Sequence, residues 1–168
     1  FLIMDDDMMK MLPNNLDSKI TWDAVQNEFG STEIIFVAYG NKGESSYNTE
    51  ALSDLWVLSN ELKNLSTVKE VSNISTSSRI DQVDGFMEIE DLQESKNLTY
   101  EQIERIESYL QKNDNIKKQY VSQSNEYLLT TIQPYDGVGL DQFRNEVVAL
   151  SKSVLADYDI HFGGTAYV

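Results

Sequence analysis

The residues that could do chemistry in this chain are few, and most of them are carboxylates. Asp5, Asp6 and Asp7 form a triplet that could hold a hard cation, and a strand would place Glu88 and Glu90 on one face. The triplet lacks the spaced ligands, loop glycine and distal glutamate of an EF-hand. Carboxylate pairs are also common on solvated strands. We therefore interpret both groups as solvated acidic residues.

Other candidate catalytic or ligand-binding residues are isolated. His161 is the only histidine, so neither a multi-histidine metal site nor a triad is indicated, and we expect its side chain to face solvent. Ser31 and Ser59 lack the Gly-x-Ser-x-Gly setting of a nucleophile. Gly137 and Gly139 lack the lysine of a phosphate loop, so we expect a loop before a helix. The sequence predicts no catalytic residue, metal ligand or cofactor, and leaves the substrate-contacting residues open.

The composition narrows the class of partner. The 168 residues carry 13 Lys and Arg against 28 Asp and Glu, a formal net charge of −15, so we expect no binding to nucleic acid. The absence of cysteine excludes disulfides and thiolate chemistry. The longest apolar run covers only residues 34–39, whereas a membrane span needs about 18 residues or more. Because the chain opens at Phe1, we expect targeting or membrane segments to lie outside it.

Hydrophobic periodicity predicts two β-α-β units. In the first, over residues 33–76, the apolar run 33–40 predicts a central strand with both faces covered, Thr49 caps a helix, and residues 68–74 form a second strand. The helix has one apolar stripe: Leu52, Leu55, Trp56, Leu62 and Leu65.

The second unit is predicted over residues 119–168. Residues 120–122 are extended, Ser124-Asn125 is a turn, and residues 126–133 alternate as a strand. A helix follows with Phe143, Val147, Leu150 and Val154 on one face, and residues 160–168 close the unit as a strand.

The residues between the two units are predicted to be less regular. Residues 75–82 are polar, Asp84-Gly85 is a turn signal before a short strand at 86–89, and residues 91–98 form a loop. Thr99 and Gln102 have the spacing of a capping box, which predicts an inserted helix over about residues 99–113.

Together these elements predict an α+β, ferredoxin-like split β-α-β fold. Its four-stranded antiparallel sheet would carry two main helices on one face, with extra short helices elsewhere. Residues 1–32 would lead into this fold and contain one short helix. We expect Trp22, Trp56 and Phe143 to be core residues.

Several phrases of the sequence resemble, in the right order, the first extracytoplasmic loop domain of RND-superfamily exporters of the MMPL-like branch. They are residues 7–13, Phe29-Gly30 with 34–37, residues 68–72, residues 84–92, residues 120–122 with 127–132, and Gly163-Gly164-Thr165. The resemblance covers nearly the whole chain. The chain departs from the family at Ser124-Asn125, where Asp-Gly is frequent, and at Gly163-Gly164-Thr165, where Gly-x-Pro is frequent.

The resemblance implies a function. RND exporters are proton-driven membrane proteins whose relay acids lie in transmembrane helices, so residues 33–168 would be an extracytoplasmic porter domain with no catalytic residue and no enzyme activity. It would handle hydrophobic or lipid-like substrate by rigid-body motion. Its partners would be the transmembrane helices and second porter domain of its own chain, and a homo-oligomer is allowed. Met4, Met8, Met9 and Met11 would pack at the membrane junction or touch substrate.

Two other classes of function stay open. One is a soluble ferredoxin-like domain that senses a ligand and dimerises through an edge strand. The other is an acidic enzyme that uses Glu88 and Glu90. A porter domain needs both ends of the fold on one side, whereas the enzyme needs a carboxylate buried in a deep cleft.

Overall fold

The structure is a computed structural model that describes residues 33–168. The predictions for Asp5-Asp6-Asp7, Trp22, Ser31 and the four N-terminal methionines lie outside the described residues. The elements follow in the order β1 (Ile35–Gly40), α3 (Thr49–Lys63), β2 (Val68–Ser72), η1 (Ile74–Thr76), β3 (Ser78–Val83), β4 (Phe86–Asp91), α4 (Tyr100–Lys112), α5 (Asp114–Tyr120), β5 (Tyr127–Pro134), α6 (Leu140–Val154) and β6 (Asp159–Gly163).

The main sheet has four strands in the order β2-β5-β1-β6, and every neighbouring pair is antiparallel. The units β1-α3-β2 and β5-α6-β6 interleave, because each contributes one of the two central strands. This order is the ferredoxin-like split β-α-β arrangement. The predicted fold class is therefore confirmed.

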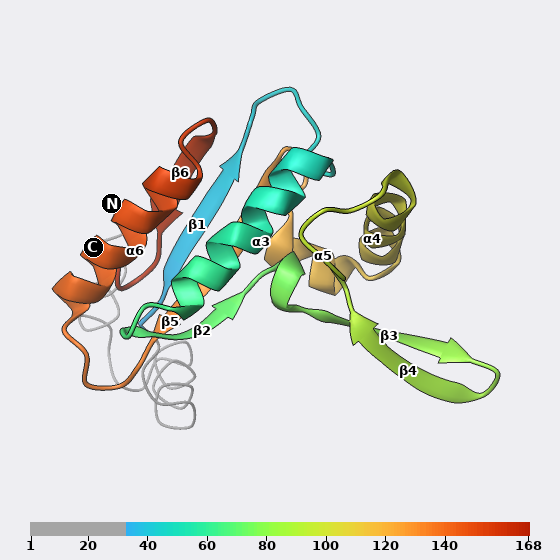
Figure 1. Ribbon diagram of the computed structural model, residues 1–168, viewed down its shortest axis with the longest axis horizontal. Helices are drawn as coiled ribbons and strands as arrows, with labels where there is room; N and C mark the ends of the chain where they lie inside the picture. Colours follow the sequence, from blue (N-terminus) through green and yellow to red (C-terminus); the bar gives the residue numbers. More distant parts are fainter. Residues whose placement is uncertain (1–32) are drawn as a thin grey trace, which may run out of the picture.

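Helices α3 and α6 lie side by side over one face of the sheet (Figure 1). The core forms between them and the sheet, where Ile35, Val37 and Tyr39 of β1 are fully buried. From α6, Phe143 and Val147 are fully buried too, which confirms Phe143 as a core residue. The prediction of two main helices on one face is confirmed.

Strand β1 is central, as predicted, since it pairs with both β5 and β6. Its two faces are covered unequally. The residues that face the helices are fully buried, whereas Phe36 and Ala38 on the other face are half-buried. The continuous apolar run thus reflects one buried face and one partly covered face.

Trp56 is the one core prediction in α3 that is wrong, because its side chain is only half-buried. The buried stripe of the helix runs through Leu55, Leu58 and Leu62. Trp56 follows Leu55 directly, so its side chain is rotated by about 100° around the helix axis from the centre of that stripe. It therefore lies at the edge of the buried face.

Several predicted boundaries shift by a few residues, and two of these shifts have a clear local cause. Asn48, and not Thr49, caps α3, because its side-chain oxygen accepts the Ala51 N–H at 2.8 Å. The last strand ends at Gly163 and does not run to residue 168, because Gly164 has φ of 100° and turns the chain out of the ladder.

The insertion between β2 and β5 is more regular than the sequence predicts. The polar residues 75–82 contain η1 and strand β3, which pairs with β4 as a hairpin that projects from the body beyond α4 (Figure 1). The sequence did not predict strand β3, because this strand is stabilised by its hydrogen-bond ladder to β4 and has no buried apolar face that would show as a pattern in the sequence. Helix α5 also ends at Tyr120, where an extended segment was expected, so only Val121 bridges to Leu128.

The first and last described segments meet at one place. The Ala166 N–H donates to the Ile34 carbonyl at 3.0 Å, and the Ile34 N–H donates to Thr165 Oγ1 at 3.1 Å. Ile34 and Thr165, which are 131 positions apart in the chain, are thus joined by a direct hydrogen bond beside strand β1. The fold therefore starts and finishes on the same side.

Candidate functional site

The feature of the described residues that most resembles a binding site is the β3–β4 hairpin, which we call the arm (residues 78–91). Asp84 and Gly85 form its two-residue turn, with φ of 51° and 84°. These are the positive values that a type I′ hairpin turn requires, and Asp-Gly is among the residue pairs that adopt them. The arm keeps one register along its whole length, from Val83 opposite Phe86 to Ser78 opposite Asp91.

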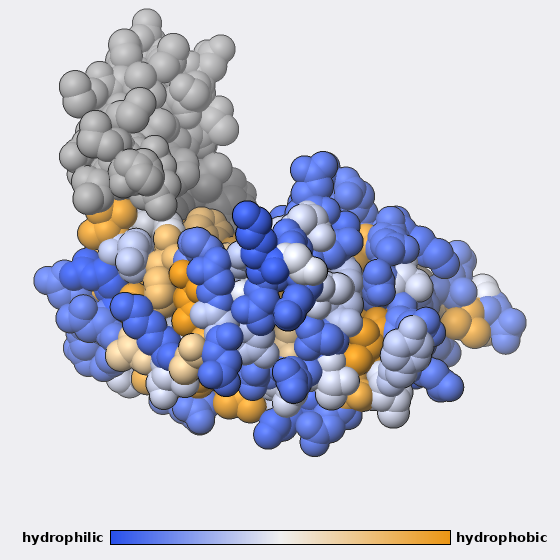
Figure 2. Space-filling view, turned by 90° about the horizontal axis from the view of Figure 1, so that it is seen from above, coloured by the Kyte–Doolittle hydropathy of each residue, from blue (hydrophilic) through white to orange (hydrophobic). Residues whose placement is uncertain are grey.

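One face of the arm, which we call the apolar face, carries three large apolar side chains beside the polar Ser78, Gln82 and Asp91. Ile80 lies opposite Ile89, and Gln82 lies opposite Met87, so their side chains share a face. Ile80, Met87 and Ile89 are 55%, 70% and 67% exposed. In Figure 2 hydrophobic atoms reach the surface near the right-hand end of the molecule, where the arm lies. A group of large apolar side chains left in water is typical of a surface that binds a partner.

The other face of the arm, which we call the charged face, carries Arg79 and three carboxylates, with the exposed apolar pair Val83 and Phe86 beside the turn. Arg79 contacts Glu90, its cross-strand partner, at 2.5 Å and Asp81 at 3.2 Å. The hydrogen bond that Arg79 donates to the Glu90 carboxylate is the main reason that the pKa of Arg79 is raised. Glu88 lies directly opposite Asp81, so two like charges face each other across the ladder.

The candidate carboxylate pair lies on this charged face. Glu88 and Glu90 share one face, as their spacing predicts, and both are exposed. Glu90 is already paired with Arg79. The arrangement lacks the buried carboxylate in a deep cleft that general acid catalysis would use, so it gives the enzyme hypothesis no support.

The base of the arm is anchored in the body. The Leu92 N–H donates to the Ser77 carbonyl at 2.8 Å, and Leu92 and Gln93 are buried. The Ile80 N–H donates to the Tyr109 hydroxyl of α4 at 3.4 Å. Because the apolar residues 103, 106 and 110 of α4 are buried in the body, this bond ties β3 to a fixed element.

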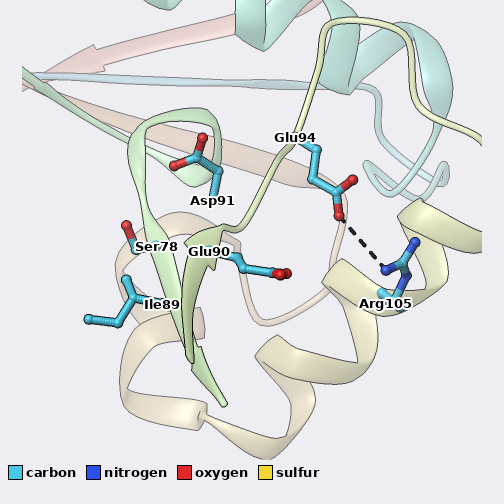
Figure 3. Close-up of a pocket in the computed structure, with 6 residues that line it drawn as sticks. All are labelled: Ser78, Ile89, Glu90, Asp91, Glu94 and Arg105. Carbon is cyan, nitrogen blue, oxygen red and sulfur yellow. Dashed lines mark ion pairs between the residues drawn. The ribbon is translucent and has the colours of Figure 1, made fainter. Parts of the chain in front are cut away.

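A hollow of about 630 Å³ lies between the base of the arm and α4. Ser78, Ile89, Glu90, Asp91, Glu94 and Arg105 line it (Figure 3). Glu90 and Glu94 point toward the helix side, whereas Ile89 points away from it. The charged face of the arm thus turns to α4, and the apolar face turns to solvent.

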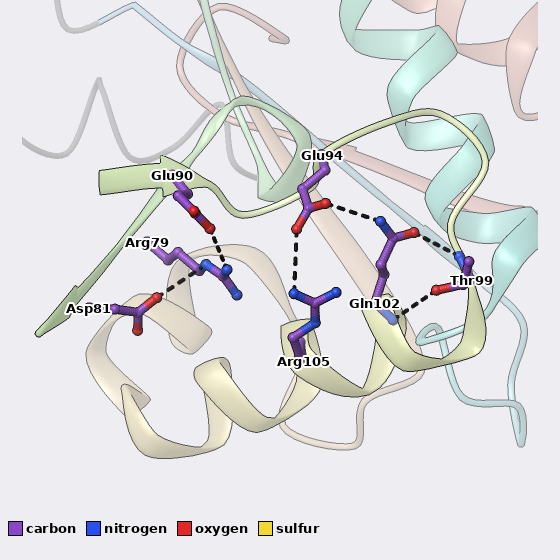
Figure 4. A network of polar contacts seen from close by, with 7 residues as sticks. All are labelled: Arg79, Asp81, Glu90, Glu94, Thr99, Gln102 and Arg105. Carbon is purple, nitrogen blue, oxygen red and sulfur yellow. Dashed lines mark hydrogen bonds and ion pairs between the residues drawn. The ribbon is translucent and has the colours of Figure 1, made fainter. Parts of the chain in front are cut away.

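The far wall of this hollow is fixed by a chain of polar contacts (Figure 4). Glu94 lies 3.8 Å from Arg105 and accepts a hydrogen bond from Gln102 at 3.0 Å. Gln102 and Thr99 form the capping box predicted for the start of α4, with bonds of 2.9 and 3.2 Å. The capping motif therefore positions both α4 and a wall of the hollow.

His161 is exposed on β6, as predicted. Its Nε2 lies 2.9 Å from Asp159, which also accepts a hydrogen bond from the Tyr127 hydroxyl at 2.8 Å. The Tyr127 bond and then the His161 contact lower the pKa of Asp159. These three groups lie on a surface, and no described cysteine or serine joins them as a nucleophile. Among residues 33–168, no cluster of metal-ligating side chains is large enough to hold an ion.

The remaining candidates have structural positions. Ser59 is buried in the core, and Gly139 precedes α6 in a loop, as predicted. Sequence reasoning missed Asn73, which is fully buried and hydrogen-bonds both Ser59 and Thr130. Its triplet Asn-x-Ser/Thr also occurs at exposed Asn64 and Asn97, so no local signal distinguishes it.

A second polar group, under α3, contains two tyrosines. The Tyr39 hydroxyl donates to the Ala51 carbonyl at 2.5 Å, the Tyr158 hydroxyl donates to Asp54 at 2.7 Å, and the two rings meet edge to face at 4.9 Å. Burial is the main cause that raises the pKa of both hydroxyls. The charge of Asp54 raises both values further.

This group predicts alkaline unfolding. A raised pKa means that the folded state holds the proton more tightly than the unfolded chain, whose tyrosines ionise near pH 10. The contribution to stability is therefore complete below about pH 10 and is lost as the pH rises beyond it. Urea unfolding followed between neutral and strongly alkaline pH should show this fall. Tyr158→Phe should make the fall shallower, and an unchanged slope would contradict the assignment.

Comparison with known proteins adds no relative. No protein-family model matches the chain, and no curated protein matches its sequence significantly. Within the described part of the chain, no helix is long and apolar enough to cross a membrane.

Proposed function

We propose that residues 33–168 are an extracytoplasmic porter domain of a proton-driven RND-type exporter in the cell membrane, which handles hydrophobic or lipid-like substrate. The proposal begins from the sequence phrases that resemble this family. The observation that carries it is the contact between Ile34 and the segment Thr165–Ala166. A domain inserted between two transmembrane helices must receive and return the chain on one side.

The ferredoxin-like layer suits motion as a unit. Helices α3 and α6 and the four-stranded sheet share one core, so the layer resists internal deformation and can rock against a neighbour. Proton transfer would belong to the transmembrane helices of the full-length protein. In this proposal the domain passes substrate by changing position and carries out no reaction.

The proposal predicts an extracytoplasmic location. Because the chain has no cysteine, Asp136→Cys, in the exposed loop before α6, would introduce one thiol in this domain. In the full-length protein on a background without other cysteines, intact cells should label this thiol with a membrane-impermeant maleimide. Labelling only after lysis would contradict the proposal.

Two further observations separate the porter from its rivals. Apolar segments of about 20 residues before Phe1 and after Val168 are required for a domain between two transmembrane helices. Cells that express the full-length protein should also extrude a lipophilic dye, and a protonophore should stop this. A full-length chain without such segments that dimerises through β2 or β6 would favour the ligand-sensing class.

A further inference from the structure

The outer edge of β4 is an open strand edge. The Ile80 N–H points out of the hairpin and donates to the Tyr109 hydroxyl. Ile80 and Ile89 therefore form a pair that is not joined by ladder hydrogen bonds. The alternation of an antiparallel ladder then turns the N–H and C=O groups of Met87 and Ile89 outward. Neither amide has a hydrogen-bond partner in the described part of the chain. Such an edge is a template for another strand.

The two faces that flank this edge are of different chemistry. A strand added beside β4 would place alternate side chains next to exposed Met87 and Ile89 on the apolar face. Its other side chains would lie next to Glu88 and Glu90, of which Glu90 is already paired with Arg79, and next to the exposed Phe86 beside the turn. An incoming strand must therefore alternate apolar side chains with side chains that tolerate carboxylates.

The charge of the arm decides what those other side chains are. The arm carries one arginine against five carboxylates, and Glu88 faces Asp81 directly. A lysine or arginine beside Glu88 would relieve this like-charge pair, whereas a second copy of the chain would add further carboxylates. The charge complement of the arm is a basic strand.

We propose that the arm binds an extended segment of a partner protein in which apolar residues alternate with Lys or Arg, by strand addition to β4. The backbone groups of Met87 and Ile89 pair with the segment, the apolar face receives its apolar side chains, and Glu88 receives a cation. This partner is additional to the transport role, and the inference does not depend on that role. An isolated two-stranded hairpin is only marginally stable, so a third strand would also fix the arm.

The test is a titration of the 168-residue chain with a short peptide that alternates valine and lysine. Two control peptides are needed: one with its valines grouped in a block, and one that alternates valine and glutamate. We expect saturable binding of the first peptide alone, with amide shifts at residues 86–91, and weaker binding at higher ionic strength. Equal binding of the blocked or acidic peptide, or no binding, would overturn the proposal.

Variants separate the backbone contribution from the charge contribution. Ile89→Pro removes an outward N–H but no rung of the arm, so it should weaken binding about tenfold, whereas Ile89→Thr keeps the N–H and should weaken it less. Glu88→Lys should also weaken binding about tenfold, and Asp136→Lys, on a distant loop with the same charge change, should have little effect. An equal loss of binding affinity in Glu88→Lys and Asp136→Lys would show that only net charge matters, and would overturn the proposal.

Rival occupants give different results. Self-association of the free chain, with amide shifts along β4 that grow with protein concentration, would identify a second copy as the occupant and overturn the proposal. The exposed positions of Ile89 and Glu88 keep these variants interpretable, because neither lies in the core. An unchanged circular dichroism spectrum and urea midpoint would confirm that each variant is folded.

Discussion

Replacing Asn73 by alanine is expected to lower the free energy of unfolding by about 3 kcal/mol. The Asn73 amide donates to Ser59 Oγ at 2.7 Å and to Thr130 Oγ1 at 3.1 Å. Its oxygen accepts the Ser75 N–H at 2.8 Å. Because Asn73 is fully buried, water cannot reach the groups that its amide now binds. Alanine would therefore leave several of these groups without a hydrogen-bond partner. Urea unfolding measures the loss, provided that the slope with denaturant is unchanged.

The matched control is Asn97→Ala. Asn97 begins the same kind of triplet but is exposed, so its replacement should change stability by less than about 0.5 kcal/mol. Thr130 lies on the buried face of β5. A double-mutant cycle of Asn73→Ala with Thr130→Val would therefore isolate the contribution of the hydrogen bond between these two side chains. Similar losses for Asn73→Ala and Asn97→Ala would contradict the assigned network.

Asn73 also connects the core to the arm. Its side chain caps η1, the single turn that precedes β3, and its N–H donates to Thr76 Oγ1 at 2.9 Å. The arm therefore leaves the body from a point that is fixed by a buried amide. This position gives a reason why a projecting hairpin can keep a defined direction.

The fold was predictable where side-chain periodicity is strong. Phe143 and Val147 mark the buried face of α6, and Leu128, Thr130 and Ile132 alternate inward along β5, as the sequence indicates. These patterns follow from burial of one face, which is what periodicity records. Two such units with amphipathic helices leave few arrangements, and the ferredoxin-like one is observed.

The candidate site was predictable only in part. Asp84-Gly85 and the strand that follows it were found because the turn chemistry is local. Strand β3 was missed, since only Ile80 and Val83 are apolar in it and both are exposed. The role of Asn73 could not be found either, because its burial results from tertiary packing and not from its neighbours in sequence.

Gly164→Ala is expected to lower the free energy of unfolding by about 3 kcal/mol, and to separate the two ends of the fold. Gly164 has φ of 100°, and a β-carbon there would lie 2.4 Å from the Ile34 carbonyl oxygen. Alanine must therefore adopt a strained backbone or push Ile34 away. The bond from the Ala166 N–H to that same carbonyl should weaken, which hydrogen exchange at Ala166 would measure.

Gly43→Ala separates backbone strain from the close contact. Gly43 has φ of 85°, but no atom lies within 4 Å of the position where its β-carbon would be. The Gly43→Ala substitution should therefore lower the free energy of unfolding by only about 1 kcal/mol, which is the penalty for the left-handed backbone alone. The excess loss in Gly164→Ala then measures how firmly the segment after β6 is held against Ile34. Because the proposed transport role requires the chain to enter and leave the domain together, equal losses in the two variants would remove the main structural support for that role.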